Sequence, residues 1–189
     1  MERRIPEPCF TDYTQGRPDK REAFTDALMR GLQHYGFIIL RDHPVPAPLL
    51  DHAYHVVAAF FAQPETTKQR YVGGSRGYAP FGMEHARDRA EPDLKEFWQI
   101  GPEHPELLQR IPTNVWPQSP DGFKPTLLAL FDALQDTGRL ILEALTPALG
   151  LPRSYFDIRA GEFLEQRLQE IGLRNQPTSQ AAEGRRTHE

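Results

Sequence analysis

Seven histidines raise the question of a metal site. A mononuclear non-haem iron site takes two histidines and one carboxylate, and a His-x-Glu or His-x-Asp pair on one strand directs both ligands to the same side. The sequence contains one such pair, His104 and Glu106. Pro102 and Pro105 flank or interrupt it and remove donors of a strand ladder. A charged loop that leads into a short helix is therefore the favoured interpretation.

Two other patterns have suitable residue types without the rest of a site. His52 and His55 stand three residues apart on a predicted helix, but no acidic or cysteine partner follows one turn later. Ser75 lies among the glycines of 73–77, one residue out of step with a Gly-x-Ser-x-Gly nucleophile elbow and without its strand and helix. We therefore predict no catalytic residue and no metal ligand in this chain.

The stretch RGYAPFGMEHARDRAEPDLKEFWQIG, residues 76–101, combines an Arg-Gly-Tyr turn, a run of charges and a strand-like end. It fits either the wall of an active site or the rim of a helical domain. Glu91 and Asp93, like Glu103 and Glu106, lie in a solvated run of charges. Nothing in the sequence distinguishes one of these carboxylates as a general acid or base.

Composition excludes several classes of protein. The 189 residues fit one domain or a large piece of a bigger fold, and the net charge of -4 provides no basic surface for a nucleic-acid backbone. The single cysteine, Cys9, allows no intramolecular disulfide and no cysteine-based zinc site. The longest apolar run, 56–62, is far shorter than the roughly 20 residues that cross a bilayer. We expect a soluble cytoplasmic protein without a nucleic-acid or membrane partner.

Helical periodicity predicts three main helices. Apolar residues recur at steps of three and four over 18–36, 48–62 and 123–149. The buried face of the second helix should include Tyr54, and Gly36 should end the first helix in a left-handed conformation. The lead-in, 1–17, is predicted to be extended.

Two short apolar runs, 37–40 and 94–100, predict strands, and the second lies between predicted loops at 73–92 and 102–120. The first run is continuous, which is typical of a strand that is covered on both faces. Two isolated strands do not form a self-sufficient sheet, so they either pair with each other or extend a sheet that is not present.

The last part of the chain changes character. A helix is possible over 162–173, but beyond it no aromatic and no branched aliphatic residue occurs. Such a segment buries too little apolar surface to offset the entropy of ordering. We therefore divide the chain into a domain over 1–160 and a divergent, disordered tail over 161–189.

Six short motifs follow one another in the order in which one enzyme family carries them. They are HYGFIILRDHPV at 34–45, FFAQPETTK at 60–68, RGY at 76–78, DLKEFWQIG at 93–101, NVWP at 114–117 and LGLPRSYF at 149–156. Together they resemble the N-terminal region of the isopenicillin N synthase-like, 2-oxoglutarate- and iron-dependent oxygenases, over about residues 5–158. Pro44 stands where the family has glycine, which forbids a left-handed turn there.

The resemblance implies an α+β, mostly helical fold with three main helices and two or three short strands. This would be the N-terminal part of a double-stranded β-helix oxygenase. In that family the His-x-Asp, distal His and Arg-x-Ser motifs that hold Fe(II) and 2-oxoglutarate follow this region, and none follows here. His188 and Glu189 end the chain without the rest of such a motif. We therefore expect a truncated or frame-shifted product that binds neither cofactor.

By the same resemblance, Arg76, Tyr78 and Glu96 are the candidate substrate-binding residues, since these motifs line the mouth of the family's iron pocket. The alternative is that Tyr78 and Trp98 are packing aromatics and the charges form a solvated rim. For the whole chain, the first hypothesis is the N-terminal portion of an oxygenase for a small molecule, inactive by itself. The second is a non-enzymatic helical interaction module. A different hydrolase or metal enzyme rests only on the weak serine and histidine patterns above.

Overall fold

The computed structural model describes residues 4–83, 95–103 and 112–156. Its elements, in chain order, are α1 (Phe10–Thr14), α2 (Pro18–Tyr35), α3 (Ala47–Phe61), α4 (Glu65–Lys68), the 3-10 turn η1 (Gln69–Tyr71), β1 (Gly77–Ala79), β2 (Phe97–Gln99) and α5 (Phe123–Leu145). About half of this part of the chain is helical, and it has one two-stranded sheet, which is consistent with a partial α+β fold. None of the described helices is long and apolar enough to cross a membrane.

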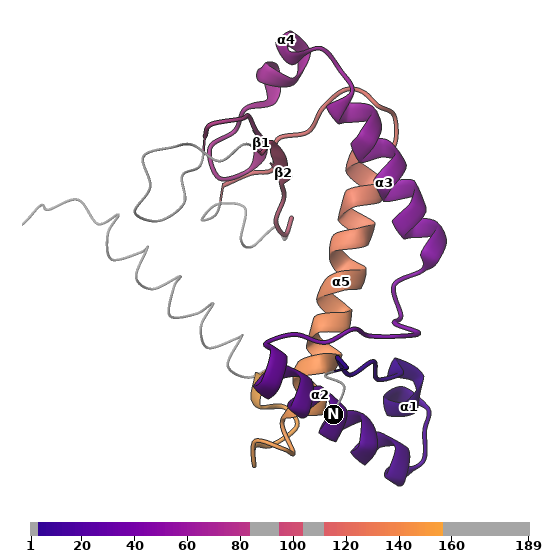
Figure 1. The fold of residues 1–189 in the computed structure, drawn as a ribbon. Coiled ribbons are helices and arrows are strands. Elements are labelled where there is room, and N and C mark those ends of the chain that lie inside the picture. The colour runs from indigo at the N-terminus through magenta and orange to yellow at the C-terminus, as the bar shows by residue number, and fades with distance from the viewer. Residues whose placement is uncertain (1–3, 84–94, 104–111, 157–189) are drawn as a thin grey trace, which may run out of the picture.

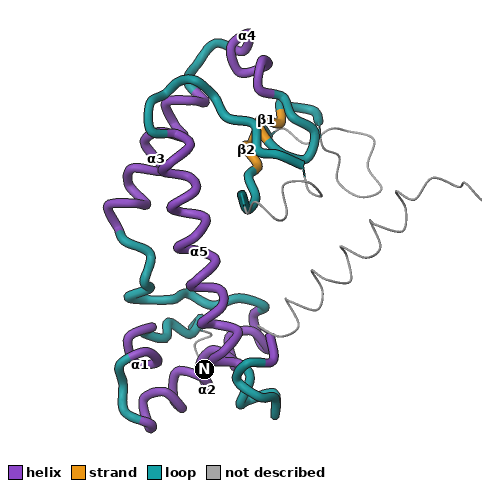
Figure 2. The backbone as a smooth tube through the Cα atoms, turned by 180° about the vertical axis from the view of Figure 1, so that it is seen from behind, coloured by secondary structure: helices purple, strands orange, loops and turns teal. Residues whose placement is uncertain are grey.

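The long helix α5 is the axis of the molecule (Figure 1). The helix α3 runs along its first half on one side, and the strand pair lies on the other (Figure 2). The helices α1 and α2 gather at its last turns. Two hydrophobic cores result, one at each end of α5.

The upper core lies between α3, α5 and the strand pair. Phe60 of α3 is fully buried at its centre, with ring centroids 4.7 Å from Trp98 and 5.4 Å from Phe123. Such ring pairs stabilise a core beyond the area that they bury. The buried members of this core are Ala53, Val56, Phe60, Tyr78, Phe123 and Leu127.

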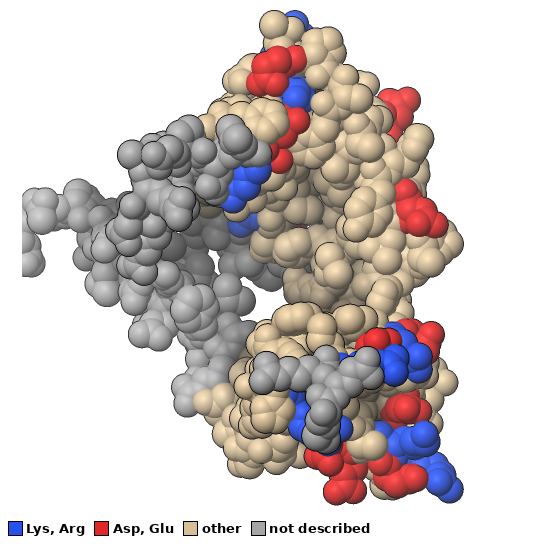
Figure 3. All heavy atoms as spheres, in the orientation of Figure 1, with Lys and Arg blue, Asp and Glu red and all other residues tan. Residues whose placement is uncertain are grey.

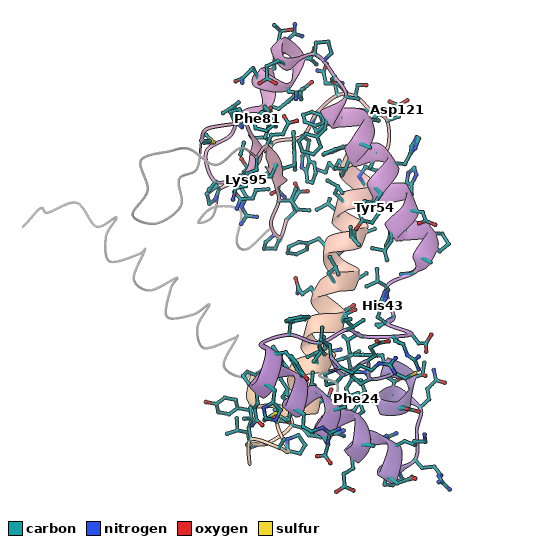
Figure 4. All side chains as sticks on the ribbon, in the orientation of Figure 1. Phe24, His43, Tyr54, Phe81, Lys95 and Asp121 are labelled. Atoms are coloured by element: carbon teal, nitrogen blue, oxygen red, sulfur yellow. The ribbon has the colours of Figure 1, made fainter. Side chains whose placement is uncertain are left out.

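The lower core joins the N-terminal helices to the end of α5. Phe24 of α2, labelled in Figure 4, packs edge-to-face on Phe10 of α1 with ring centroids 5.7 Å apart. Ala144 of α5 is completely buried against these helices. The predicted end of α2 is confirmed, because Gly36 has a φ of 76° and its amide donates to the carbonyl of Leu32 at 3.1 Å.

Two predictions about the N-terminal region are wrong. Residues 37–40 are extended but form no strand, and the bridge next to them, between Cys9 and Arg41, is an isolated one. Phe37 and Ile39 are 52% and 46% exposed. The apolar run is thus covered on one face only. A continuous run of apolar residues did not, in this case, indicate burial on both faces. The lead-in is not wholly extended, since it contains α1.

The second predicted strand exists, but its partner lies in a predicted loop. β2 pairs in antiparallel register with β1, so that Tyr78 stands opposite Trp98. The side chain of Tyr54, predicted to be buried on α3, is 75% exposed (Figure 4). The helix predicted at 162–173 and the disorder predicted for 161–189 lie outside the described residues.

Candidate functional site

Four polar side chains, from α4, from β1 and from the residue before β2, form a cluster beside the strand pair. Tyr78 on β1 is 1% exposed, and its hydroxyl donates to Glu96 Oε2 at 2.5 Å. Lys68 Nζ, at the end of α4, donates to the same oxygen at 2.6 Å and lies 3.2 Å from Glu65 Oε2. Glu65 and Lys68 lie one helical turn apart, and Glu96 lies just before β2. The buried ammonium group of Lys68 therefore lies between two carboxylates.

The surroundings fix the protonation states in this cluster. Burial, and then the hydrogen bond to Glu96, raises the pKa of Tyr78 to about 12. The hydrogen bond to Glu96 raises the pKa of Lys68 above its ordinary value. The pKa of Glu65 is lowered by hydrogen bonds from Gln69 and Lys68. Near neutral pH, therefore, the Tyr78 phenol and the Lys68 ammonium group are protonated donors, and the Glu65 carboxylate is an acceptor.

Arg76 precedes β1 and lies on the backbone of Gly101, which follows β2. A Cβ atom at position 101 would stand 1.0 Å from Arg76 Nη1, so the guanidinium occupies the space of the missing side chain. Asn114 bonds both backbone groups of Gly101, accepting from its amide at 2.9 Å and donating to its carbonyl at 2.7 Å. We call this arrangement of Arg76, Gly101 and Asn114 the Arg76 slot.

Glu103 fixes the loop that carries Asn114. It accepts hydrogen bonds from Trp116 Nε1 at 2.7 Å and Asn114 Nδ2 at 3.3 Å, and it pairs with Lys124 of α5 at 2.9 Å. Burial by itself would raise the pKa of Glu103, but the three donors outweigh it and hold the pKa below its ordinary value. The slot is thus anchored to both the loop and α5.

Two hollows adjoin the strand pair. The apolar hollow, of about 330 Å³, lies between β2, α3 and α5, and its lining consists of Val57, Phe61, Glu96, Phe97, Trp98, Ile100, Leu127, Leu130, Phe131 and Leu134. The Arg76 hollow, of about 420 Å³, shares Ile100 and Phe131 with it and adds Ser75, Arg76, Gln99, Gly101, Pro102 and Pro112. In Figure 3 charged side chains gather over α4 and over α1 and α2, and a further group of basic atoms lies between them, next to the grey atoms.

The structure places the three candidate substrate-binding residues around the strand pair. Tyr78 and Glu96 are bonded to each other, whereas Arg76 stands apart from both, in its slot. Glu96 lines the apolar hollow and Arg76 the Arg76 hollow, but Tyr78 lines neither. The sequence did not single out Lys68 or Asn114, although the motifs FFAQPETTK and NVWP contain them.

The described residues do not fit an iron centre. Within them, no three histidine, cysteine, aspartate or glutamate side chains gather closely enough to hold a metal ion. His52 and His55 are exposed on α3, and Ser75 is exposed at the edge of the Arg76 hollow. His104 and Glu106 lie outside the described residues. No chemical step through iron is therefore derived for this part of the chain.

Comparison with known proteins places these features in a family. Residues 10–119 match the family described as non-haem dioxygenase in morphine synthesis N-terminal. The proline hydroxylase buaE of Petromyces alliaceus is 28% identical over 158 residues, which are 78% of this chain and 48% of that protein. The 2-oxoglutarate-dependent dioxygenase thnC of Trichoderma harzianum is 28% identical, over 70% of this chain and 44% of that protein.

Solved structures agree with this result. A full-length Neurospora crassa protein, in complex with alpha-KG, superposes with a TM-score of 0.68 and 28% identity, over 81% of this chain and 50% of that one. A structure assigned to the 2OG-Fe(II) oxygenase family from Caulobacter crescentus gives a TM-score of 0.66 and 34% identity, over 81% and 51%. The chain spans about half the length of the curated relatives that it matches. It belongs to the non-haem dioxygenase N-terminal family, and the resemblance seen in its motifs is confirmed.

Proposed function

We propose that this chain forms the N-terminal portion of a non-haem Fe(II)- and 2-oxoglutarate-dependent oxygenase that acts on a small molecule. The observation that carries the proposal is the family match over residues 10–119, in a chain that spans about half of each relative. In the complete fold, its helices and its strand pair would cover a double-stranded β-helix. The relatives named above support the reaction class.

Substrate recognition is the role that we propose for the strand pair. The structures of the Neurospora crassa protein hold alpha-KG with thymine or 5-formyluracil, which supports a small-molecule substrate. In this chain Arg76 would contact the substrate directly. Glu96 would line the site, and Tyr78 would hold Glu96 in position through its 2.5 Å hydrogen bond.

The proposal places the ligands of Fe(II) and 2-oxoglutarate outside residues 1–160. Fe(II) with 2-oxoglutarate would supply the oxidising chemistry of the complete fold, and this chain would supply only walls and positioning. By itself the chain should then be inactive.

Anaerobic addition of Fe(II) and 2-oxoglutarate to the purified chain tests this. We expect no charge-transfer absorbance band and, after exposure to oxygen, no succinate above the level of free iron. A full-length 2-oxoglutarate-dependent dioxygenase in parallel shows that the reagents are active. A band that saturates at one iron per chain, or enzymatic release of succinate, would refute the inactive assignment.

A further inference from the structure

We propose that Arg76 is the anion-binding group of a site for a small molecule that carries a carboxylate on an apolar body. The site is the Arg76 hollow, between the strand pair and α5. The inference rests on the proposed function, because it names the class of substrate that the strand pair would recognise.

Arg76 is a partly buried cation without a partner among the described residues. In this part of the chain, every lysine and arginine other than Lys68 and Arg76 is largely open to solvent. Lys68 is neutralised by Glu65 and Glu96. The guanidinium of Arg76 has no hydrogen bond or ion pair with any of the described residues. The guanidinium nitrogens still reach water, since among the described residues Trp98 Nε1 is the side-chain nitrogen that is both buried and unpaired. A carboxylate could replace that water with charge-assisted hydrogen bonds to the guanidinium.

The chain leaves room for the guanidinium of Arg76 in a fixed place. Gly101 is buried and is not among the glycines with a left-handed backbone, so its conformation does not require glycine. Its missing side chain is instead the space that Arg76 Nη1 occupies. The two hydrogen bonds of Asn114 hold Gly101 in position. The slot therefore holds the guanidinium before a ligand arrives, which reduces the entropy lost on binding.

The hollow beside the slot combines polar and apolar side chains in the way that small-molecule sites do. Its volume of about 420 Å³ is in the range of small-molecule sites. Besides Arg76, Ser75 and Gln99 provide polar groups, and Ile100 and Phe131 provide apolar surface. A guanidinium binds a carboxylate through two parallel hydrogen bonds, a geometry that a lysine cannot provide. Together these features fit a carboxylate whose organic part lies on Ile100 and Phe131.

A pair of probes of nearly equal shape tests the inference. Phenylacetate carries the carboxylate, and phenylacetamide replaces it with a neutral amide. NMR titration of the full chain, which detects weak binding, should show phenylacetate binding at least about tenfold more tightly. 2-Oxoglutarate, which has two carboxylates but no comparable apolar body, should bind more weakly than phenylacetate.

Variants assign the binding to the slot. Arg76→Gln and Gly101→Ala should each lower the affinity for phenylacetate about tenfold or more. The first variant removes the guanidinium and the second displaces it. Arg76→Lys should recover less than half of the lost binding free energy, because it keeps the charge without the planar fork. Arg70→Gln, at an exposed arginine of η1, is the control and should change binding less than about twofold. Because Arg76 makes no side-chain bond to the described residues, Arg76→Gln should fold even if Gly101→Ala does not.

Four results would overturn the inference: no binding of phenylacetate, equal binding of the amide, tighter binding of 2-oxoglutarate, or unchanged binding by Arg76→Gln. None of these measurements uses iron or turnover. A failure here accordingly leaves the proposed oxygenase assignment standing, and a failure of the iron titration leaves the probe result standing.

Discussion

Lys68 and Lys124 make nearly the same bond in different surroundings. Lys68 lies 2.6 Å from Glu96 with 7% of its side chain exposed, and Lys124 lies 2.9 Å from Glu103 with 48% exposed. Removal of one partner from a buried pair leaves an uncompensated charge, whereas water replaces the partner of an exposed one. The two lysines thus form a matched pair for measuring what burial adds.

We predict that Lys68→Met lowers the free energy of unfolding by about 3 kcal/mol. Lys124→Met should lower it by less than about 1 kcal/mol. Urea unfolding of the full chain, followed by far-ultraviolet circular dichroism, measures both. Equal losses would show that burial of the Lys68–Glu96 pair adds nothing to the cost of removing its lysine.

The residues of the site were predictable only where a motif contained them. Short motifs predicted Arg76, Tyr78 and Glu96 as site residues. They did not predict the hydrogen bond between Tyr78 and Glu96, because it joins positions 18 residues apart. Lys68 reaches Glu96 across 28 residues. The role of Gly101 depends on where the Arg76 side chain lies, and neither residue by itself indicates the contact.

At the scale of the helices, two glycines have opposite effects on stability. Gly36 ends α2 with a φ of 76°, a conformation that strains any residue with a Cβ. Gly138 lies inside α5, and a Cβ there would meet nothing within 4 Å. Glycine is thus required at the first position and only weakens the helix at the second.

We predict that Gly36→Ala destabilises the chain by about 1 kcal/mol and that Gly138→Ala stabilises it by about 0.5–1 kcal/mol. Thermal unfolding of the two variants beside the parent should shift the midpoint in opposite directions. A higher unfolding midpoint for Gly36→Ala would mean that α2 does not end in a left-handed residue. A lower midpoint for Gly138→Ala would mean that neighbouring atoms leave no space for the added methyl group.

The helices were predictable and the strands only partly, for a physical reason. A helix of 15 to 23 residues repeats its apolar spacing several times, so the pattern of α2, α3 and α5 is redundant. Strands of three residues have no such redundancy. β1 was missed inside a glycine-rich loop, and the run at 37–40 was assigned to a strand because its apolar residues are continuous. Ile39 of this run instead donates its amide to the carbonyl of Pro6, and Arg41, just after the run, donates to the carbonyl of Pro8.

For the molecule as a whole, the side of α5 that faces the hollows is apolar. Leu134 is 52% exposed there, next to Phe131 and Leu130, which line the apolar hollow with it. Apolar surface of this kind marks contact with another part of a fold or with a ligand.

We predict that the neutral dye Nile red binds at this apolar face, with a rise in its fluorescence. Leu134→Gln should lower the affinity for Nile red about threefold, because apolar contact with the dye is lost. Tyr54→Gln, which changes a side chain 75% exposed on α3, is the control and should leave the dye unaffected. A dye signal that is insensitive to Leu134→Gln would place the binding elsewhere.

Because α5 contributes to both hydrophobic cores, insertions and deletions within this helix are constrained. The 23 residues of α5 extend about 34 Å, from Phe123 in one core to Ala144 in the other. Deleting or inserting a single residue near the middle would turn one end about 100° around the axis relative to the other. Phe24 and Leu28 would then meet the wrong side of the rod. Length changes should accordingly accumulate in the connecting loops and spare the centre of α5.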